Sequence, residues 1–343
     1  MPFIHISKLF TQFFLAIAIF ISFSNSHAMT LKIATLAPDG TTWMKEMRAA
    51  GREINEKTAG RVKLKFYPGG VMGNDKSMIK KIRLGQLQGG AMTGGSLASI
   101  YPDMQIYSLP MVFKNYSEID YVRPVIDPLL KKGMKKKGFT ILGISEGGFA
   151  YLMSNSTLKD VADLKKHKLW IPEDDVLNEA LFRKMGVHPV TLSLADVYTG
   201  LQTGLIDTIG STTTGALAFQ WHTRIRSITD VPLVYLIGVL IVDNKHFNKI
   251  NAADQKIIKD IITKSFSALD KVNRKDNENA RQALQKMGTE FAKPDDSEIA
   301  YWSRLADEVI EETGSRAASP ELYQQLKDLL KEYRSGMDSS AVR

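Results

Sequence analysis

The chain contains no cysteine in its 343 residues. That absence excludes disulfide bonds, thiol nucleophiles, cysteine-bound zinc and iron–sulfur clusters. Histidine is also scarce: the 6 histidines show none of the spacings of metal ligands, so we expect no metal site and no cofactor. The net charge is +8, yet the basic residues are spread along the chain without interleaved aromatic residues, which argues against a nucleic-acid partner.

Long hydrophobic runs are confined to the beginning of the sequence. Lys8 precedes an apolar run over residues 13–21, and Ser26-His27-Ala28 follows with small residues at the −3 and −1 positions of a cleavage site. This order is typical of a secretory signal peptide, and the run is shorter than the roughly 20 residues of a membrane span; an uncleaved anchor is the alternative. We therefore predict export to the periplasm, with cleavage near Ala28.

Two series of alternating strands and helices follow, one over residues 31–96 and one over 167–209. This alternation predicts α/β lobes with parallel sheets. Segments 139–144, 150–155 and 228–243 have the apolar character of further strands that cross between the lobes. Residues 252–287 lack glycine and proline and predict a very long helix or two abutting helices.

These patterns predict an α/β fold of two lobes, with hinge strands and a long bracing helix. The predicted parts are a signal peptide at 1–28, the first part of lobe I at 29–152, lobe II at 153–238, a return to lobe I with the long helix at 239–290, C-terminal helices at 291–334 and a frayed tail at 335–343. Such an architecture in an exported chain is typical of a hinged solute-binding protein with its ligand between the lobes.

Several short motifs stand in a characteristic order along the mature chain. They are Leu36-Ala37-Pro38, Tyr67-Pro68-Gly69-Gly70 with Gly73, Gly85-Gln86-Leu87-Gln88-Gly89-Gly90, Leu109-Pro110-Met111-Val112-Phe113 and Leu201-Gln202-Thr203-Gly204-Leu205-Ile206-Asp207. Together they resemble the DctP-type periplasmic solute receptors of tripartite ATP-independent periplasmic (TRAP) transporters, from about residue 31 to 288. The resemblance implies a receptor, not an enzyme, that captures a small molecule and delivers it to membrane permease subunits.

The chain departs from that family at the positions that bind carboxylates. Members usually carry an arginine in a Lys-x-Arg-x-Pro context, and its guanidinium forks onto the carboxylate of an organic acid. Here Trp170 stands at that position, and the strand around Ala150 has no basic residue. An aromatic replacement favours an apolar or ring-bearing ligand. A subset of these receptors with a hydrophobic cleft is associated with a periplasmic tetratricopeptide-repeat lipoprotein, which is a further partner implied by the resemblance.

We therefore expect an apolar, aromatic cleft with a few neutral hydrogen-bonding groups. The predicted ligand-binding residues are Trp170, Phe149, Tyr151, Trp43, Thr93, Ser96, Ser211, Thr213, Tyr198 and Gln220. The alternative is an ordinary organic-acid receptor in which a relocated arginine, Arg183, Arg224 or Arg226, binds the carboxylate. For Trp170 alone, packing in a core is the competing interpretation.

Two other motifs have weaker interpretations. Gly143-Ile144-Ser145-Glu146-Gly147 matches the Gly-x-Ser-x-Gly elbow of a secreted serine hydrolase, but an apolar extended segment follows it where that elbow requires a helix. Glu173, Asp174 and Asp175 could bind calcium, although they also suit the beginning of a helix. We expect neither activity.

Overall fold

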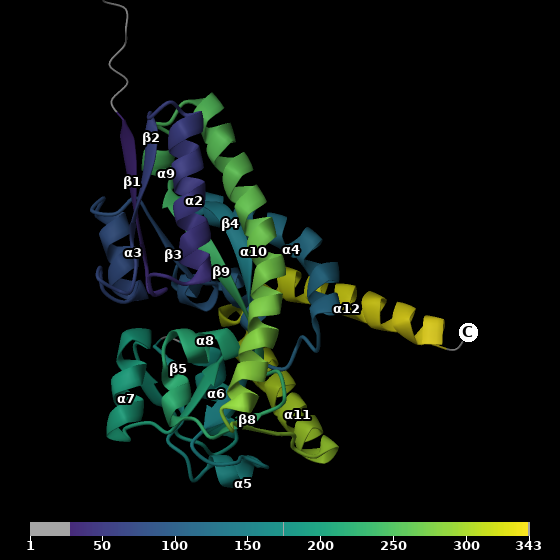
Figure 1. The fold of residues 1–343 in the computed structure, drawn as a ribbon. Helices are drawn as coiled ribbons and strands as arrows, with labels where there is room; N and C mark the ends of the chain where they lie inside the picture. Colours follow the sequence, from purple (N-terminus) through teal and green to yellow (C-terminus); the bar gives the residue numbers. More distant parts are fainter. Residues whose placement is uncertain (1–27, 174, 342–343) are drawn as a thin grey trace, which may run out of the picture.

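The computed structural model describes residues 28–173 and 175–341. The predicted signal peptide, apart from Ala28, lies outside the described residues. Two α/β bodies stand one above the other, and a single long helix runs along both (Figure 1). Among the described residues, no helix is long and apolar enough to cross a membrane.

Lobe I is built on strands β1 (Met29–Thr35), β2 (Val62–Tyr67) and β3 (Gly89–Thr93). β1 pairs in parallel with both others, as the alternation of strands and helices predicts. Helices α2 (Thr42–Lys57) and α3 (Asp75–Arg83) connect them, and both begin at side-chain caps. The Thr41 hydroxyl accepts the backbone N–H of Met44, which fixes the beginning of α2 beside the β1–α2 loop.

Two strands cross between the lobes. β4 (Phe139–Ser154) and β9 (Val234–Asp243) pair antiparallel over most of their length. The sequence predicted separate segments at 139–144 and 150–155, and that division is wrong. The glycine-rich stretch between them stays extended, and the pairing with β9 shifts register there, as at a β-bulge. Gly148 has a φ of +103° there, and a Cβ atom would lie 2.6 Å from the Asn277 side chain, so the bend requires glycine.

Lobe II continues from the far half of β4. β7 and β8 pair with β4, and β10 pairs with β8. The sheet order is β10-β8-β4-β9-β3-β1-β2, so β4 belongs to both lobes. The strands are β5 (Trp170–Pro172), β6 (Val190–Leu192), β7 (Thr208–Ser211), β8 (Ser227–Thr229) and β10 (Glu290–Ala292). The helices are α5 (Val161–Leu164), α6 (Val176–Lys184), α7 (Val197–Thr203) and α8 (Thr213–Ala218).

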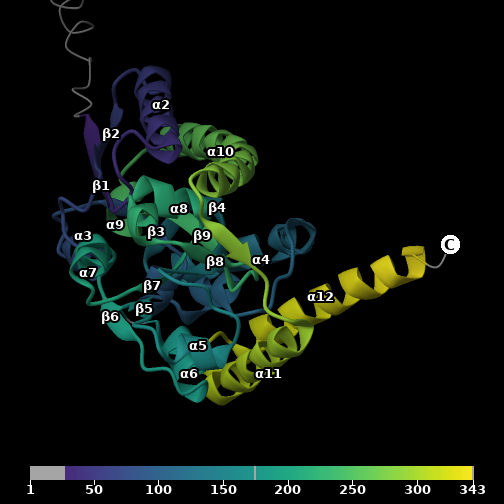
Figure 2. The same cartoon turned by 60° about the horizontal axis from the view of Figure 1, so that its bottom comes forward.

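The long helix predicted at 252–287 is confirmed as one helix, α10 (Ala252–Lys286), of 35 residues. It packs against α2 of lobe I, β4 and α8 of lobe II, so it braces the whole molecule. The chain ends with α11 (Asp296–Thr313) and α12 (Pro320–Ala341), and α12 projects away from the body in both views (Figures 1 and 2). The tail predicted to fray from residue 335 continues as helix to residue 341, because Gly336 lies within α12 and does not end it.

The remaining elements fill the junctions of the sheet. Helix α4 (Tyr116–Lys136) covers β4, and α9 (Asn244–Phe247) follows β9. Short 3-10 turns lie at Gly95–Ser99, Pro102–Ser108, Leu194–Asp196, Trp221–Arg224 and Gly314–Arg316. The turns at 95–99, 102–108 and 221–224 contribute buried side chains to the cores.

Candidate ligand-binding cavity between the lobes

A cavity of about 850 Å³ lies where the two lobes, the crossing strands and α10 meet. This volume is within the usual range for small-molecule sites, roughly 300–1,000 Å³. Its lining residues are Ala37, Pro38, Asp39, Gly40, Thr41, Thr42, Trp43, Ser145, Glu146, Gly147, Thr212, Thr214, Gly215, Leu217, Ala218, Phe219, Gly238, Asn273, Asp276, Asn279, Ala280 and Ala283. We call it the interlobe cavity.

Lobe I contributes the β1–α2 loop and the first turn of α2. The Thr42 hydroxyl donates to Asp276 Oδ2 on α10 at 2.9 Å, which ties this wall to the long helix. Trp43 packs edge-on against Phe266 of α10, with ring centroids 6.4 Å apart. The backbone N–H groups of a first helical turn have no intrahelical acceptor, so this wall presents positive partial charge.

Lobe II contributes α8 and the residue that ends it, Phe219. Thr212 caps α8 by accepting the N–H of Gly215 at 3.0 Å. Asn277 of α10 holds the same turn: its Oδ1 accepts the Thr214 hydroxyl at 2.7 Å, and its Nδ2 donates to the Gly147 carbonyl at 3.0 Å. One α10 side chain therefore fixes both the lobe II wall and the bend in β4.

The base of the cavity carries a buried charged network. Arg274 donates to both carboxylate oxygens of Glu146, and Arg123 donates to Glu146 Oε1 at 3.2 Å and to Asp270 Oδ2 at 2.7 Å. Burial raises the pKa of Asp270, and the nearby Arg123 charge opposes that rise. Glu146 is only 3% exposed, so its charge needs these arginines as partners. The guanidinium groups that bind Glu146 are therefore not free to bind a ligand.

The charge of the lining is unusual for a site that would bind an anion. Asp39, Glu146 and Asp276 line the cavity, and no lysine or arginine occurs among its lining residues in the part of the chain that the structure describes. Asp39 is paired with Arg48 at 2.9 Å, and Glu146 is paired with Arg274. Among the described residues, Asp276 has one hydrogen bond, from the Thr42 hydroxyl, and no ion pair.

Four predicted aromatic residues have different surroundings. Trp43 lines the interlobe cavity. Trp170 lies inside lobe II, 4% exposed, where its indole N–H donates to the Leu192 carbonyl at 3.0 Å and its ring contacts Trp221. Phe149 is buried in an aromatic cluster with Tyr116 and Tyr235, and Tyr151 is half-buried beside lobe II. Trp170, Phe149 and Tyr151 are absent from the lining, because Trp170 and Phe149 pack within cores and Tyr151 packs against them.

The predicted polar residues lie at or beyond the margins of the cavity. Ser211 and Thr213 flank the lining residue Thr212, and the Thr213 hydroxyl donates to the Asn277 carbonyl at 2.7 Å. Thr93 and Ser96 are hydrogen-bonded to each other, and Ser96 donates to Asp75, the first residue of α3. Tyr198, on α7, and Gln220 lie outside the lining. Their contact with ligand remains a prediction.

The arginines considered as replacements do not enter the interlobe cavity. Arg183 pairs with Glu179 on the surface of α6, and Arg224 bonds to Gln202. Arg226 is exposed near β8. Ser145 does line the cavity, but it lies within β4, where the elbow geometry is absent. Its hydroxyl donates to the Gly238 carbonyl at 3.4 Å, and it has no histidine partner among the described residues.

Sequence reasoning missed most of the α10 wall. Asp276, Asn277 and Asn279 carry no motif, and their amphipathic helix gives no sign of which lobe it faces. Phe219 was also missed. The signal that could have found these residues is the cluster of polar side chains, Asn273 to Asn279, in the middle of a helix that otherwise buries isoleucine and leucine.

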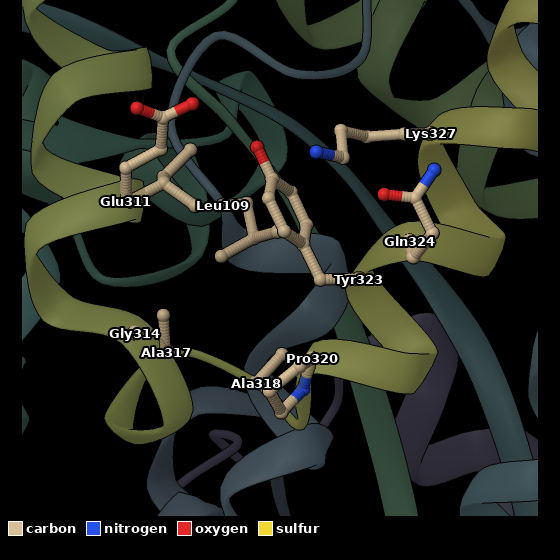
Figure 3. Close-up of a pocket in the computed structure, with 10 residues that line it drawn as sticks. Leu109, Glu311, Gly314, Ala317, Ala318, Pro320, Tyr323, Gln324 and Lys327 are labelled. Carbon is tan, nitrogen blue, oxygen red and sulfur yellow. The ribbon is translucent and has the colours of Figure 1, made fainter.

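A second, smaller cavity of about 270 Å³ lies among the C-terminal helices (Figure 3). Tyr323 stands at its centre, between Glu311 of α11 and Lys327 of α12. It is lined by α11, α12, the turn between them and Leu109. A ligand there would not bridge the two lobes, so the interlobe cavity is the better candidate site.

The fold and the interlobe cavity define a two-lobed solute-binding protein. The family model of bacterial extracellular solute-binding proteins, family 7 (DctP), matches residues 33–316, and the chain belongs to that family. Its members are solute receptors and not enzymes, and they work in the periplasm. The predicted family and fold are therefore confirmed.

Two curated relatives in the family show how similar the sequences are. The chain is 27% identical to the C4-dicarboxylate-binding periplasmic protein DctP of Rhodobacter capsulatus, over 77% of this chain and 80% of the relative. It is 30% identical to the 2,3-diketo-L-gulonate-binding periplasmic protein YiaO of Escherichia coli, over 45% of this chain and 47% of the relative. The match to YiaO thus spans about half of that protein's length.

Solved structures share the fold. The sugar acid binding protein DctPAm of Advenella mimigardefordensis, in complex with galactonate, has a TM-score of 0.82 at 18% identity and covers 89% of this chain and 98% of its own. TRAP periplasmic solute binding proteins with bound D-glucuronate, L-gulonate or succinate superpose at TM-scores of 0.79–0.80. At these identities the likeness concerns the fold alone.

Proposed function

We propose that this protein is a periplasmic receptor that captures a small organic acid in the interlobe cavity and delivers it to a TRAP membrane permease. The observation that carries the proposal is the lining of the cavity by both lobes, both crossing strands and α10. A ligand that contacts both lobes stabilises the closed arrangement over an open one, because only the closed arrangement makes both sets of contacts. The permease can then distinguish the ligand-bound receptor, which is closed, from the empty one, which is open.

The relatives favour an organic acid over the apolar ligand that Trp170 led us to expect. Two relatives are named for binding C4-dicarboxylates and 2,3-diketo-L-gulonate, and one solved structure holds the sugar acid galactonate. The packing of Trp170 inside lobe II also weakens the reason for expecting an apolar cleft. Trp43 and Phe219, which line the cavity from different lobes, are suited to the faces of a sugar ring or a carbon chain.

A carboxylate can be bound here without an arginine. The N-terminus of α2, a helix of 16 residues, opens into the cavity at Thr42 and Trp43. Unpaired N–H groups and the helix dipole favour an anion at such an end. The Trp43 indole N–H, which has no acceptor among the described residues, adds a neutral donor on the same wall.

The proposed receptor is exported with a cleaved signal peptide and acts with membrane partners. Cleavage near Ala28 would release a mature protein that begins at β1, since Met29 is the first residue of that strand. A tetratricopeptide-repeat lipoprotein would accompany an apolar ligand and is therefore the less favoured partner. N-terminal sequencing of the exported protein tests the cleavage site directly.

Ligand screening by thermal unfolding and calorimetry tests the proposed function. L-gulonate, D-glucuronate and succinate should each be compared with neutral aromatic solutes such as phenol and indole. An organic acid at 100 times its dissociation constant should stabilise the protein by about 2.7 kcal/mol, and small-angle scattering should show compaction. Stabilisation by neutral aromatic solutes alone would overturn the organic-acid assignment and restore the apolar one.

A further inference from the structure

Three polar side chains meet in lobe II, at the end of the β4–β7 pair opposite to the interlobe cavity. Ser156 follows the end of β4, His167 precedes β5, and Asp207 precedes β7. β4 and β7 are antiparallel neighbours and β5 begins beside β7, so the three positions share one edge of the sheet. The interlobe cavity takes its lining from the other end of the pair, at Gly147 and Thr212. We call the three residues the Ser156 cluster.

The Ser156 cluster forms a chain of hydrogen bonds with a fixed direction. Ser156 Oγ lies 2.9 Å from His167 Nε2, and His167 Nδ1 lies 3.0 Å from Asp207 Oδ1. Because an ionised carboxylate only accepts hydrogen bonds, Nδ1 carries the hydrogen. In a neutral imidazole Nε2 is then the acceptor, so the Ser156 hydroxyl donates to it. This is the order of a nucleophile, its base and the carboxylate that orients the base.

The carboxylate of the cluster is firmly held. Asp207 Oδ1 also accepts the Lys168 backbone N–H at 2.9 Å and the Thr208 hydroxyl at 3.0 Å. The His167 side chain is 11% exposed and that of Asp207 is 22% exposed, whereas Ser156 is exposed. The base is therefore shielded from water while the nucleophile is open to a reactant.

The backbone beside the serine supplies hydrogen-bond donors. The N–H groups of Ser156 and Thr157 have no acceptor among the described residues. The Thr157 hydroxyl donates to Glu290 Oε2 at 2.6 Å, which ties this turn to β10. N–H groups at and next to a nucleophile are the kind of donor that stabilises the oxyanion formed during acyl transfer.

We propose that Ser156 is a nucleophilic serine that accepts an acyl group from small activated esters, with His167 as its general base and Asp207 as the positioning residue. Ser156 Oγ bonds to the acyl carbon while its proton passes to His167 Nε2. The ester C–O bond then breaks, and the leaving alcohol takes that proton. The ester must be small and have a good leaving group, because Ser156 is exposed and belongs to neither cavity described above.

The test uses p-nitrophenyl acetate, which releases coloured p-nitrophenolate when its acetyl group is transferred. Peptide mass spectrometry after acid quenching locates the acetylated residue. We expect Ser156 to be acetylated about a hundredfold faster than Ser193, since a positioned general base contributes roughly that factor or more. Ser193 is the matched control, because it also lies in lobe II but donates its hydroxyl directly to a carboxylate, Asp196 Oδ2, at 2.6 Å.

Variants test the role of each member. Ser156→Ala should remove the fast release of p-nitrophenolate, whereas Ser193→Ala should leave it unchanged. His167→Ala should slow acetylation about a hundredfold, and added imidazole should restore part of the rate. Asp207→Asn should slow it about tenfold or more, because an amide that donates to Nδ1 selects the tautomer with its hydrogen on Nε2. Nitrogen NMR of His167 reports that tautomer, which a loss of stability alone would not change.

Two results would overturn the proposal. Equal acetylation of Ser156 and Ser193, or an unchanged rate in His167→Ala, would leave the cluster with a structural role only. If Asp207→Asn impairs folding, the rate of His167→Ala and its rescue by imidazole give the answer instead. L-gulonate affinity in Ser156→Ala should equal that of the wild type, because the reaction is separate from solute capture.

Discussion

Asn74 of lobe I and Glu173 of lobe II meet directly across the gap between the lobes. Asn74 Nδ2 donates to Glu173 Oε2 at 3.1 Å. Asn74 also caps α3, which lies on the side of the molecule away from α10 (Figures 1 and 2). The lobes are thus joined by this contact on one side and by the ties of α10 to Thr42 and Thr214 on the other.

The Asn74–Glu173 contact should favour the closed arrangement. Asn74→Asp keeps an oxygen to cap α3 but loses the donor and places a second negative charge beside Glu173. We expect the ratio of closed to open molecules to fall by about fivefold, as a bond of about 1 kcal/mol implies. Fluorescence energy transfer between labels on the two lobes measures it, with Glu173→Gln as the variant that removes the repulsion. An unchanged transfer efficiency in Asn74→Asp would show that the contact does not bias closure.

Asp75, one residue further on, should make stability depend on pH. Burial raises the pKa of its carboxyl to about 6, although the hydrogen bond from Ser96 opposes the rise. The folded protein then holds this proton up to about pH 6, whereas the unfolded chain releases it near pH 4. The free energy of unfolding should therefore fall as the pH rises through this window, by up to about 3 kcal/mol.

Asp75→Asn removes this titration and keeps an acceptor for Ser96. Its free energy of unfolding relative to wild type should rise between pH 4 and pH 6 and stay higher above pH 6. Urea unfolding at each pH measures the difference, and Asp260→Asn, an exposed carboxylate on α10, supplies the control. A constant difference across the window would mean that Asp75 titrates normally in the folded state.

The buried network under the cavity should be costly to disrupt. Arg123 is the partner of Asp127, Glu146 and Asp270, and it also donates to the Ile144 carbonyl. Arg123→Ala leaves buried carboxylates without their counter-charge and should cost about 3–5 kcal/mol of unfolding free energy. Arg183→Ala, which breaks an exposed pair with Glu179, should change it by less than about 0.5 kcal/mol. Similar losses in the two variants would contradict the role of burial.

The sequence predicted the elements of the fold better than the surroundings of the site. Residues 252–287 could be recognised as helical because helix-breaking residues are absent. The crossing strand β4 was split in the prediction because Gly147 and Gly148 imitate a turn. In the fold those glycines permit bulges beside α10.

Apart from Trp43, the lining of the interlobe cavity was not predicted, because burial erases the alternation on which strand reasoning depends. Leu169, Trp170 and Ile171 are all at most 4% exposed, so no face of β5 is marked as the one toward a ligand. Trp170 therefore looked like a ligand contact from its position in the family motif, while the structure packs it in lobe II. The polar wall of α10 is created by tertiary contact alone, over sequence separations such as that of Thr42 from Asp276.

Trp43 and Trp170 provide the sharpest separation between binding and packing. Trp170 is buried against Trp221 and bonded to the Leu192 carbonyl, so Trp170→Ala should cost about 3–5 kcal/mol of unfolding free energy. Trp170→Phe retains most of the apolar volume and should lose less. Neither change should alter gulonate affinity in the folded protein by more than about twofold, since the side chain is absent from the cavity lining.

Trp43 should behave in the opposite way. It lines the cavity and is only partly buried, so Trp43→Ala removes an apolar face and an indole donor from the ligand at a smaller cost to stability. We expect a gulonate affinity loss of about tenfold or more, as a lost hydrogen bond and apolar contact together imply. Calorimetry measures affinity and urea unfolding measures stability in both variants. If Trp170→Ala abolished binding while Trp43→Ala left it intact, the ligand would lie against β5, and the interlobe cavity would have to be abandoned as the site.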